Sequence, residues 1–298
     1  MKPKLFIHIG THKTASTVIQ NALDVNRNAL RAAGLLYPST RRGSFPELPK
    51  HDRLFETLID PAPAAFDAEF AAFMDEFEAS GCTAMIISEE ALSEPHFDRF
   101  MKLRRFADHF DMRVICYLRR PDFFIESLWN QRCKEGICKT HVGPFVKAPF
   151  NRRRVLYDEI LDWWSAFADV HAVNYENVKS GQVVSSFSDA IGHALPAKEN
   201  PILNASPSAQ CALLMSGFNA LEKRFDRAKL IAAFADDRQK HALGMRLREE
   251  LLDGLSAHLD RLEQRYGVQF DRDMPDEPQF PMTQLKPRVC ANAFASLM

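Results

Sequence analysis

Residues 4–23 read KLFIHIGTHKTASTVIQNAL and join two different periodicities. Lys4 to Ile9 form a mainly apolar run closed by Gly10, which is typical of a short buried strand. From Val18 onward the apolar residues recur at helical spacing, and this pattern ends at Gly34. The segment therefore predicts a strand, a tight turn and a helix.

The turn, residues 10–17 (GTHKTAST), concentrates groups that bind anions. It lies where the predicted strand passes into the helix, so its backbone N–H groups converge with the amino end of the helix. Lys13 adds a full positive charge, and Thr14, Ser16 and Thr17 add hydroxyl donors. This combination predicts a phosphate site.

The spacing differs from that of the ATPase loop G-x-x-x-x-G-K-[ST]. His12 stands where that loop has its second glycine, and Lys13 follows Gly10 by only three positions. The next two predicted strands run into residues 88–90 (SEE) and 119–120 (RR), and neither is a clear acidic end that would hold magnesium. We therefore expect a phosphate site without magnesium and no metal site.

Strand and helix patterns alternate along the first 200 residues. The predicted strands span 4–9, 82–87, 113–118 and 170–175, and the helical patterns that follow the first of these span 18–33, 95–110, 123–133 and 155–167. This alternation predicts an α/β fold of three layers, with a central, mostly parallel sheet flanked by helices. Beyond residue 200 the pattern becomes helical.

Residues 6–17, FIHIGTHKTAST, resemble the 5′-phosphosulfate loop of the sulfotransferases that use 3′-phosphoadenosine 5′-phosphosulfate (PAPS). In bacterial members this loop reads H-I-G-x-x-K-T-G-T-T. Ser16 keeps the hydroxyl of the family's threonine, whereas Ala15 replaces a glycine. Alanine has less backbone freedom than glycine, so we expect residue 15 to have a negative φ.

A second segment, residues 114–127 (VICYLRRPDFFIES), resembles the 3′-phosphate element of the same family. That element is a strand ending in arginine, with a serine eight residues later on the next helix, and Arg119 and Ser127 have this spacing. An arginine at the carboxyl end of a central strand is placed to fork onto a phosphate. Arg120 would bind the 3′-phosphate instead if the strand ended one residue earlier.

Two shorter segments are also similar to bacterial sulfotransferases. Residues 86–93 (IISEEALS) are similar to their S-S-E-x-L strand end, and residues 173–178 (VNYENV) to their Y-E-x-L strand. The glycine-rich third nucleotide loop of the cytosolic animal enzymes is not recognisable. The last 120 residues resemble no family.

The resemblance implies a P-loop-like fold and transfer of a sulfuryl group from PAPS to a hydroxyl or amine of a carbohydrate or other small metabolite. Lys13 would neutralise the bridge oxygen of the leaving phosphate, and Arg119 and Ser127 would hold the 3′-phosphate. The 5′-phosphosulfate end would be held by the loop residues Gly10, Thr11, His12, Lys13, Thr14, Ala15, Ser16 and Thr17.

Such a transfer needs a base that accepts the acceptor's proton. Glu89 is the first candidate, because it lies at the carboxyl end of a strand, where α/β sheets bind ligands, and burial would raise its pKa toward neutrality. Helix capping or a surface position is the alternative for this residue. His51 is the second candidate, placed to open a helix after a Pro-rich stretch. Glu90, His12 and His141 are weaker candidates.

Two other classes of function remain open. A phosphate-loop kinase or nucleotide hydrolase would share residues 10–17 but would need carboxylates for magnesium. A nucleotide-binding protein that has lost its transferase activity would fit Ala15 and the missing third loop. Magnesium-dependent ATP turnover would identify the first class, and cofactor binding without transfer the second.

Charge and cysteine content limit the partners. The 38 Lys and Arg residues nearly balance 39 Asp and Glu residues, so the chain lacks the positive field of a nucleic-acid-binding or membrane-surface protein. No apolar run approaches 18 residues, which predicts no membrane span. The six cysteines include no C-x-x-C pair, so we expect reduced thiols in the cytoplasm, with neither metal nor disulfide at Cys133 and Cys138.

The composition along the chain predicts three parts: a PAPS-binding core (1–200), a helical extension packed on the core (201–270) and a Pro-containing tail (271–298). Residues 38–53 and 136–154 are predicted to be irregular basic loops over the site. An apolar stripe along residues 243–266, interrupted by Arg248, predicts helix packing within the subunit. A homodimer through this C-terminal helix is the alternative.

Overall fold

A computed structural model describes residues 2–39, 48–179, 181–195, 207–222, 224–237 and 241–274. The chain divides into two compact units. The first unit comprises residues 1–119, 156–201 and 258–270, and the second comprises residues 120–155, 202–257 and 271–298. These units group the chain differently from the predicted parts 1–200, 201–270 and 271–298, which stay a prediction.

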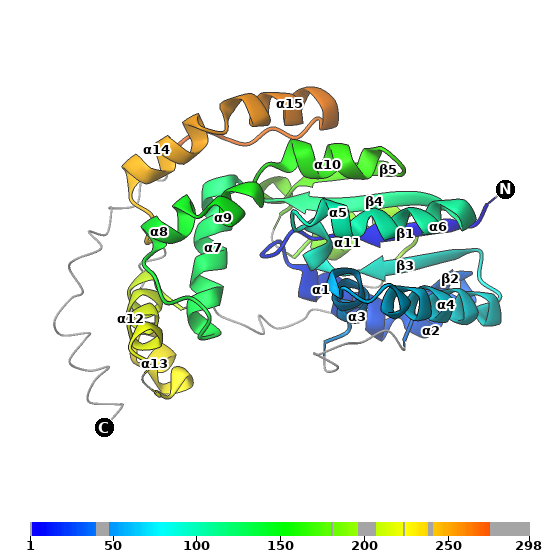
Figure 1. The fold of residues 1–298 in the computed structure, drawn as a ribbon, viewed down its shortest axis with the longest axis horizontal. Coiled ribbons are helices and arrows are strands. Elements are labelled where there is room, and N and C mark those ends of the chain that lie inside the picture. Colours follow the sequence, from blue (N-terminus) through cyan, green and yellow to red (C-terminus); the bar gives the residue numbers. More distant parts are fainter. Residues whose placement is uncertain are drawn as a thin grey trace. The chain divides into compact units, whose positions relative to one another are not determined.

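The first unit contains a five-stranded sheet in the order β2-β3-β1-β4-β5, with every pair parallel (Figure 1). The strands are β1 (Lys4–His8), β2 (Leu35–Leu36), β3 (Ala84–Ser88), β4 (Asp111–Leu118) and β5 (Asp169–Asn174). The predicted α/β class is therefore confirmed, and four predicted strands agree with the structure within two residues. The sequence analysis missed β2, because two residues are too short to show a strand periodicity.

Helices flank the sheet on both faces. On one face, Phe6 and Ile115 share a buried cluster with Leu23 of α1 and Phe187 of α11. The opposite face is covered by α4, α6 and α10, as right-handed crossovers between parallel strands require (Figure 1). The helices of this unit are α1 (Ser16–Val25), α2 (Arg27–Ala32), α3 (Asp52–Ile59), α4 (Pro63–Ser80), α5 (Phe97–Phe100), α6 (Arg104–His109), α10 (Tyr157–Ser165), α11 (Val183–Ile191) and most of α15 (Ser256–Tyr266).

Strand β1 lies at the point where the chain changes direction across the sheet. From β1 the chain passes through α1 toward β2 and β3 on one side, whereas β4 and β5 lie on the other side. Open α/β sheets bind ligands at the carboxyl ends of their strands beside such a switch point. The segments that follow β1, β3 and β4 therefore surround the expected ligand position.

Two predicted helices of the first unit are interrupted in the structure. The pattern at 18–33 corresponds to α1 and α2, which are separated at Asn26. Its side-chain amide donates to the carbonyl of Ala22, the kind of local bond with which asparagine competes against helix continuation. The pattern at 95–110 is divided among α5, a 3₁₀ turn (Met101–Leu103) and α6.

The second unit consists of helices α7 (Pro121–Lys134), α8 (Val142–Lys147), α9 (Pro149–Arg153), α12 (Ala209–Ala220), α13 (Arg227–Ala233) and α14 (Met245–Asp253). The prediction of an irregular loop over residues 136–154 is wrong for α8 and α9. Both helices are too short to show a helical periodicity, and α9 begins with a proline, a residue favoured at the first helical position. For residues 38–53, the part at 40–47 lies outside the described residues.

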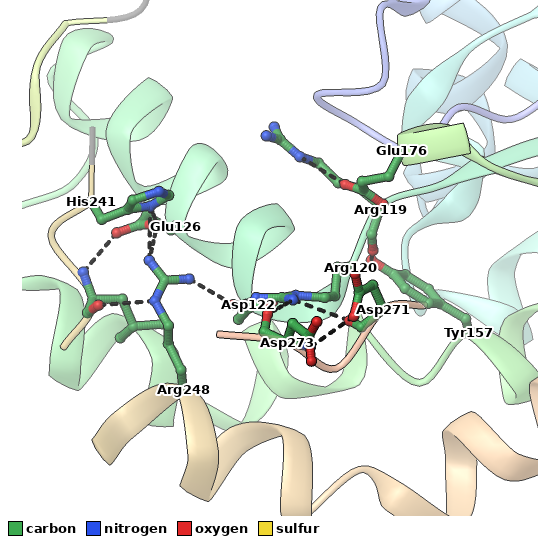
Figure 2. Close-up of polar contacts among 11 residues, drawn as sticks. Arg119, Arg120, Asp122, Glu126, Tyr157, Glu176, His241, Arg248, Asp271 and Asp273 are labelled. Atoms are coloured by element: carbon green, nitrogen blue, oxygen red, sulfur yellow. Dashed lines mark hydrogen bonds and ion pairs between the residues drawn. The ribbon is translucent and has the colours of Figure 1, made fainter. Parts of the chain in front are cut away.

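A buried network of opposite charges explains why Arg248 interrupts the apolar stripe (Figure 2). Arg248 is 2% exposed and donates hydrogen bonds to Asp122 and Glu126 of α7. Arg120 holds both oxygens of Asp122, at 2.7 and 2.9 Å, and also bonds the backbone carbonyls of Asp271 and Asp273. Paired charges are the form in which arginine is tolerated in an interior.

The other half of the stripe packs within the first unit. Leu262 of α15 is fully buried, and Asp158 of α10 accepts hydrogen bonds from His258 and Arg261 at 2.9 and 2.7 Å. Packing of this part of the stripe within the chain agrees with the sequence analysis, and the homodimer stays a prediction. Among the described residues, no helix is both long and apolar enough to cross a membrane.

Candidate active site

The loop after β1 begins at a position that only glycine fits. Gly10 has a φ of +84°, and a Cβ atom there would lie 2.8 Å from the Cβ of Glu90. The N–H of Thr11 then donates to the carbonyl of Tyr117 at 2.7 Å, which fastens the loop to β4. The sequence thus places residues 10–17 between the carboxyl ends of β3 and β4.

Ala15 has a φ of +61°, so the expectation of a negative φ at this residue is wrong. Alanine in the left-handed region costs about 1–2 kcal/mol. Its carbonyl accepts the N–H groups of Val18 and Ile19, so this conformation opens the first turn of α1. Lys13 is also left-handed, with a φ of +66°. Residues 13 and 15 therefore adopt the left-handed backbone conformation that glycine favours, although neither is a glycine.

Three of the four hydroxyls of the loop donate to backbone carbonyls, two within the loop and one on β4. Thr14 and Ser16 both donate to the carbonyl of Thr11, at 2.6 and 3.2 Å, and Thr11 donates to the carbonyl of Tyr117. Thr17 is exposed. The hydroxyls of Thr11, Thr14 and Ser16 therefore shape the loop in this structure.

The backbone N–H groups at the start of α1 are placed to donate hydrogen bonds to an anion. Within the described part of the chain, the N–H groups of residues 14–17 donate to no backbone carbonyl. The first N–H groups of a helix lack partners inside the helix, and together with the helix dipole they favour an anion. Lys13, on the same loop, adds its positive charge.

Two adjacent glutamates follow β3 and have opposite protonation properties. Glu89 is fully buried, and its carboxylate accepts the N–H of Ala91 at 2.9 Å. Burial and the neighbouring Glu90 carboxylate raise the pKa of Glu89 to about 8. Burial also opposes ionisation of Glu90, but the charges of Lys50 and His12 outweigh it and lower the pKa of Glu90 to about 2.

Lys50 connects the two carboxylates. Its Nζ lies 3.5 Å from Oε2 of Glu89 and 3.6 Å from Oε1 of Glu90. Burial alone would lower the pKa of Lys50, but the two glutamates raise it, so the ammonium group stays charged. The sequence analysis did not single out Lys50. Its only signal was its position beside His51 in a basic, Pro-rich stretch.

Glu90 also connects Glu89 and Lys50 to residues 10–17, which we call the anion loop. Its Oε1 lies 3.9 Å from Nδ1 of His12, and its Oε2 accepts a hydrogen bond from Gln20 of α1 at 2.9 Å. The other ring nitrogen of His12 lies 3.3 Å from Glu94. The structure therefore brings His12 and Glu90 together with Lys50 and Glu89.

His51 precedes α3, as predicted, but both of its ring nitrogens are bonded within the protein. Nδ1 accepts the N–H of Ser88 at 3.0 Å, and Nε2 donates to the carbonyl of Pro38 at 3.2 Å. The ring is 2% exposed, and burial lowers the pKa of His51 to about 4. This arrangement makes His51 a neutral bridge that anchors its segment to β3, and it leaves no nitrogen for an acceptor.

Arg119 directly follows β4, at the same edge of the sheet as the anion loop. Its Nε lies 3.5 Å from the carboxylate of Glu176, and its carbonyl accepts the hydroxyl of Tyr157 at 2.8 Å (Figure 2). Arg120 is held in the buried network of the second unit, whereas Arg119 lies in the first unit beside Glu176. Ser127 is half-buried on α7 of the second unit, and its pairing with Arg119 stays a prediction.

Glu176 and Tyr157 are contacts that the sequence analysis did not assign. Glu176 belongs to the quoted segment 173–178, and the structure places it beside Arg119. Among the described residues, no group of three or more His, Cys, Asp or Glu side chains is arranged to hold a metal ion. His141 lies in the second unit, just before α8, and is exposed.

Comparison with known proteins identifies the fold. No family model matches the chain. An uncharacterised protein of Archaeoglobus fulgidus is 26% identical over 136 residues, which cover 42% of this chain and only 34% of that protein. The chain thus spans about a third of the length of this relative.

Two solved structures are similar to this one. A sulfotransferase from Alicyclobacillus acidocaldarius superposes with a TM-score of 0.50 and 14% identity, covering 91% of this chain and 98% of its own. A sulfotransferase domain from the curacin biosynthetic pathway has a TM-score of 0.42 and 14% identity, covering 86% and 98%. The parallel sheet in the order β2-β3-β1-β4-β5, with the anion loop after its central strand, therefore has the sulfotransferase fold that the sequence resemblance implied.

Proposed function

We propose that this protein transfers a sulfuryl group from PAPS to a hydroxyl or amine of an acceptor, a carbohydrate or another small metabolite. The observation that carries the proposal is that, among the described residues, the backbone N–H groups of residues 14–17 donate to no backbone carbonyl. They open α1 at the same sheet edge as Lys13, Glu89 and Arg119. An anion bound there is met by donors, by positive charge and by a buried carboxyl group.

The donor would bind through its two phosphate ends. The N–H groups of the loop and Lys13 would hold the 5′-phosphosulfate, because they offer several donors and one positive charge in a small space. Arg119 would hold the 3′-phosphate, with Glu176 orienting its guanidinium through Nε. Ser127 would add a hydroxyl to the same phosphate.

In the transfer, the bond between sulfur and the phosphate bridge oxygen breaks as the acceptor oxygen or nitrogen bonds to sulfur. Lys13 would offset the negative charge that develops on the bridge oxygen, and such preorganised charge is a large part of catalysis in related group transfers. The proton of the acceptor would pass to the carboxylate of Glu89. Glu90 and Lys50 would hold that carboxylate in position.

The pKa of Glu89 is suited to its proposed role as the base that accepts the acceptor's proton. An ionised group of pKa about 8 is a stronger base than an ordinary glutamate, and a fraction of it is ionised at neutral pH. His51, whose nitrogens are both bonded, would support Glu89 indirectly by anchoring the neighbouring segment to β3. We further propose that the protein acts in the cytoplasm, because the five described cysteines are free thiols.

Calorimetry with 3′-phosphoadenosine 5′-phosphate, with and without magnesium, tests the proposal. We expect binding that is equal in both conditions, followed by sulfuryl transfer from PAPS in a screen of acceptors. Magnesium-dependent ATP turnover would favour a kinase or hydrolase instead. Tight nucleotide binding without transfer to any acceptor would favour a protein that has lost the activity.

The Lys13→Ala variant tests the catalytic part of the site. We expect transfer to fall by about 10²–10³-fold, the usual cost of removing one stabilising donor, while the far-ultraviolet circular dichroism stays unchanged. Lys4→Ala is the matched control, because Lys4 is an exposed lysine at the amino end of β1, whereas Lys13 lies in the loop that follows the carboxyl end of β1. Equal turnover of the two variants would remove Lys13 from the mechanism.

A further inference from the structure

Two cysteines meet at the carboxyl end of α7 in the second unit. Cys133 lies in the last turn of the helix, which ends at Lys134. Gly136, with a φ of +83°, then reverses the chain. The N–H groups of Ile137 and Cys138 both donate to the carbonyl of Arg132 at 3.0 Å, which brings Cys138 back beside the helix.

Asn219 of α12 holds the two cysteine backbones together. Its side-chain amide donates to the carbonyl of Cys133 at 2.9 Å and to the carbonyl of Cys138 at 3.0 Å. One buried nitrogen therefore bridges both residues, and a change in their separation would break at least one of these bonds. Their proximity is a property of the packed unit, since α12 is more than 70 residues away in sequence.

The two thiols influence each other's ionisation and differ in acidity. Interaction with the Cys133 thiol is the largest cause that lowers the pKa of Cys138, to about 6; burial opposes it, and Thr140 and Trp129 lower the pKa further. Interaction with Cys138 and burial raise the pKa of Cys133. Cys138 is therefore the more acidic thiol of the pair.

The surroundings allow a small oxidant to reach Cys138 first. Cys133 is fully buried, whereas Cys138 is 6% exposed and lies between Ile137, which is 61% exposed, and the exposed Lys139. Reactivity of cysteine toward peroxides follows thiolate character and access. Both features favour Cys138 as the attacking residue and Cys133 as the residue that resolves the product.

We propose that Cys133 and Cys138 form an oxidation site, in which a peroxide converts the thiol pair into an intramolecular disulfide. The Cys138 thiolate attacks one oxygen of hydrogen peroxide, the O–O bond breaks, and Cys138 sulfenic acid and a hydroxide ion form; the hydroxide takes a proton from solvent and becomes water. The sulfur of Cys133 then attacks the sulfur of Cys138, its proton leaves with the hydroxide as a second water, and the S–S bond forms. Two thiols lose two electrons, and one peroxide gains them. This site is independent of the proposed transferase activity.

Peptide mapping tests the proposal directly on the whole protein. Trypsin cleaves after Arg132, Lys134 and Lys139, so Cys133 and Cys138 fall on separate peptides, residues 133–134 and 135–139. After treatment with hydrogen peroxide and alkylation, we expect these two peptides to be linked by a disulfide. The protein should lose two of its six titratable thiols and regain them with dithiothreitol.

Two single variants separate the parts of the two cysteines. In Cys133→Ser, we expect Cys138 to stop at the sulfenic acid, which dimedone traps, whereas Cys138→Ser should leave Cys133 unmodified at the same peroxide dose. Cys211→Ser, another fully buried cysteine of this unit, should keep the linked peptides. A full count of six thiols in oxidised wild-type protein, or a disulfide from Cys138 to any other cysteine, would overturn the proposal.

Discussion

Ala15 occupies a backbone conformation that glycine adopts much more readily. Its φ of +61° opens the first turn of α1, and the carbonyl of Ala15 accepts two N–H groups of that turn. The bonds from Thr14 and Ser16 to the carbonyl of Thr11 hold the loop in this path. Hydrogen bonds within the loop thus hold a backbone conformation that alanine itself disfavours.

Restoring the glycine should stabilise the protein. We expect Ala15→Gly to raise the free energy of unfolding by about 1 kcal/mol, because it removes the cost of a left-handed alanine. Ala71→Gly, at an exposed position inside α4, should have the opposite sign and lose about 1 kcal/mol. Urea unfolding of the three proteins measures both changes, and a loss of stability in Ala15→Gly would contradict the assigned conformation.

Glu89 makes the proposed transfer depend on pH in a defined direction. Its pKa is raised to about 8, so the ionised base is scarce below that pH and dominant above it. We expect kcat/KM to rise tenfold per pH unit up to about pH 8 and then to level off. Glu89→Gln should lose this rise together with most of the activity.

Removing the charge of Lys50 gives a second test of Glu89 as the base, because that charge affects the pKa of Glu89. Lys50 lowers the pKa of Glu89, so Lys50→Met should move the midpoint of the pH profile upward. Glu78→Gln, an exposed change on α4, should leave the profile unchanged. A midpoint near pH 4 to 5 in the wild-type protein would exclude Glu89 as the base.

At the scale of elements, the charged network of the second unit shows how α7 and α14 are joined. Burial opposes ionisation of Asp122, but hydrogen bonds and charge from Arg120 and Arg248 outweigh it and hold the pKa of Asp122 below its usual range. In Glu126 burial is likewise outweighed, by the hydrogen bond of His241 and the charge of Arg248, and the pKa of Glu126 is lowered. Arg248 of α14 pairs with Asp122 and Glu126 of α7, and Arg120 and His241 balance the same two carboxylates (Figure 2).

Removing one partner should therefore be costly. We expect Arg248→Met to lower the free energy of unfolding by about 3–5 kcal/mol, because Asp122 and Glu126 would stay buried with less compensation. Arg246→Met, on the same helix but with its side chain 91% exposed, should change stability by less than about 0.5 kcal/mol. Thermal unfolding followed by circular dichroism compares them, and equal midpoints would contradict the network.

The pH dependence of this difference has a definite sign. Carboxylates with a lowered folded-state pKa stabilise the protein above their unfolded pKa of about 4, and this contribution is lost as pH falls. The stability gap between wild-type protein and Arg248→Met should therefore be present at pH 7 and shrink as the solution is acidified below pH 4. A gap that grows on acidification would show that the carboxylates are not its source.

At the scale of the whole molecule, the parallel sheet brings together segments that lie far apart in sequence. The loop after β1, the glutamates after β3 and Arg119 after β4 reach one edge because parallel strands end on the same side. The proposed recognition of a doubly phosphorylated nucleotide would use two of these segments at once. The proposed site therefore depends on strand order as much as on its residues.

The Arg119→Ala variant tests the proposed role of Arg119 in binding the 3′-phosphate. We expect binding of 3′-phosphoadenosine 5′-phosphate to weaken by about 10–100-fold, as for the loss of a charged hydrogen bond, while adenosine 5′-phosphate loses little. Arg113→Ala, at the other end of β4, should affect neither nucleotide. Calorimetric titration measures both affinities, and equal losses for the two nucleotides in Arg119→Ala would refute the assignment.

Local periodicity and residue spacing were sufficient to predict most strands of the sheet and the α/β class of this protein. The apolar run at residues 4–9, the closing Gly10 and the helical pattern after it determined β1, its loop and α1, because these features depend on neighbours along the chain. The same signals predicted β3, β4 and β5 and the α/β class. The positions of Lys13, Glu89 and Arg119 at strand ends followed from the same patterns.

Long-range packing decided the rest. The bonding of His51 to Ser88 and the placement of Lys50 between two glutamates depend on contacts with distant segments. The buried Arg248 likewise has its partners on another helix, so no pattern along α14 reveals them. Sequence periodicity reports which face of an element is apolar, whereas pKa values and hydrogen-bond partners follow from the atoms that folding brings next to each group.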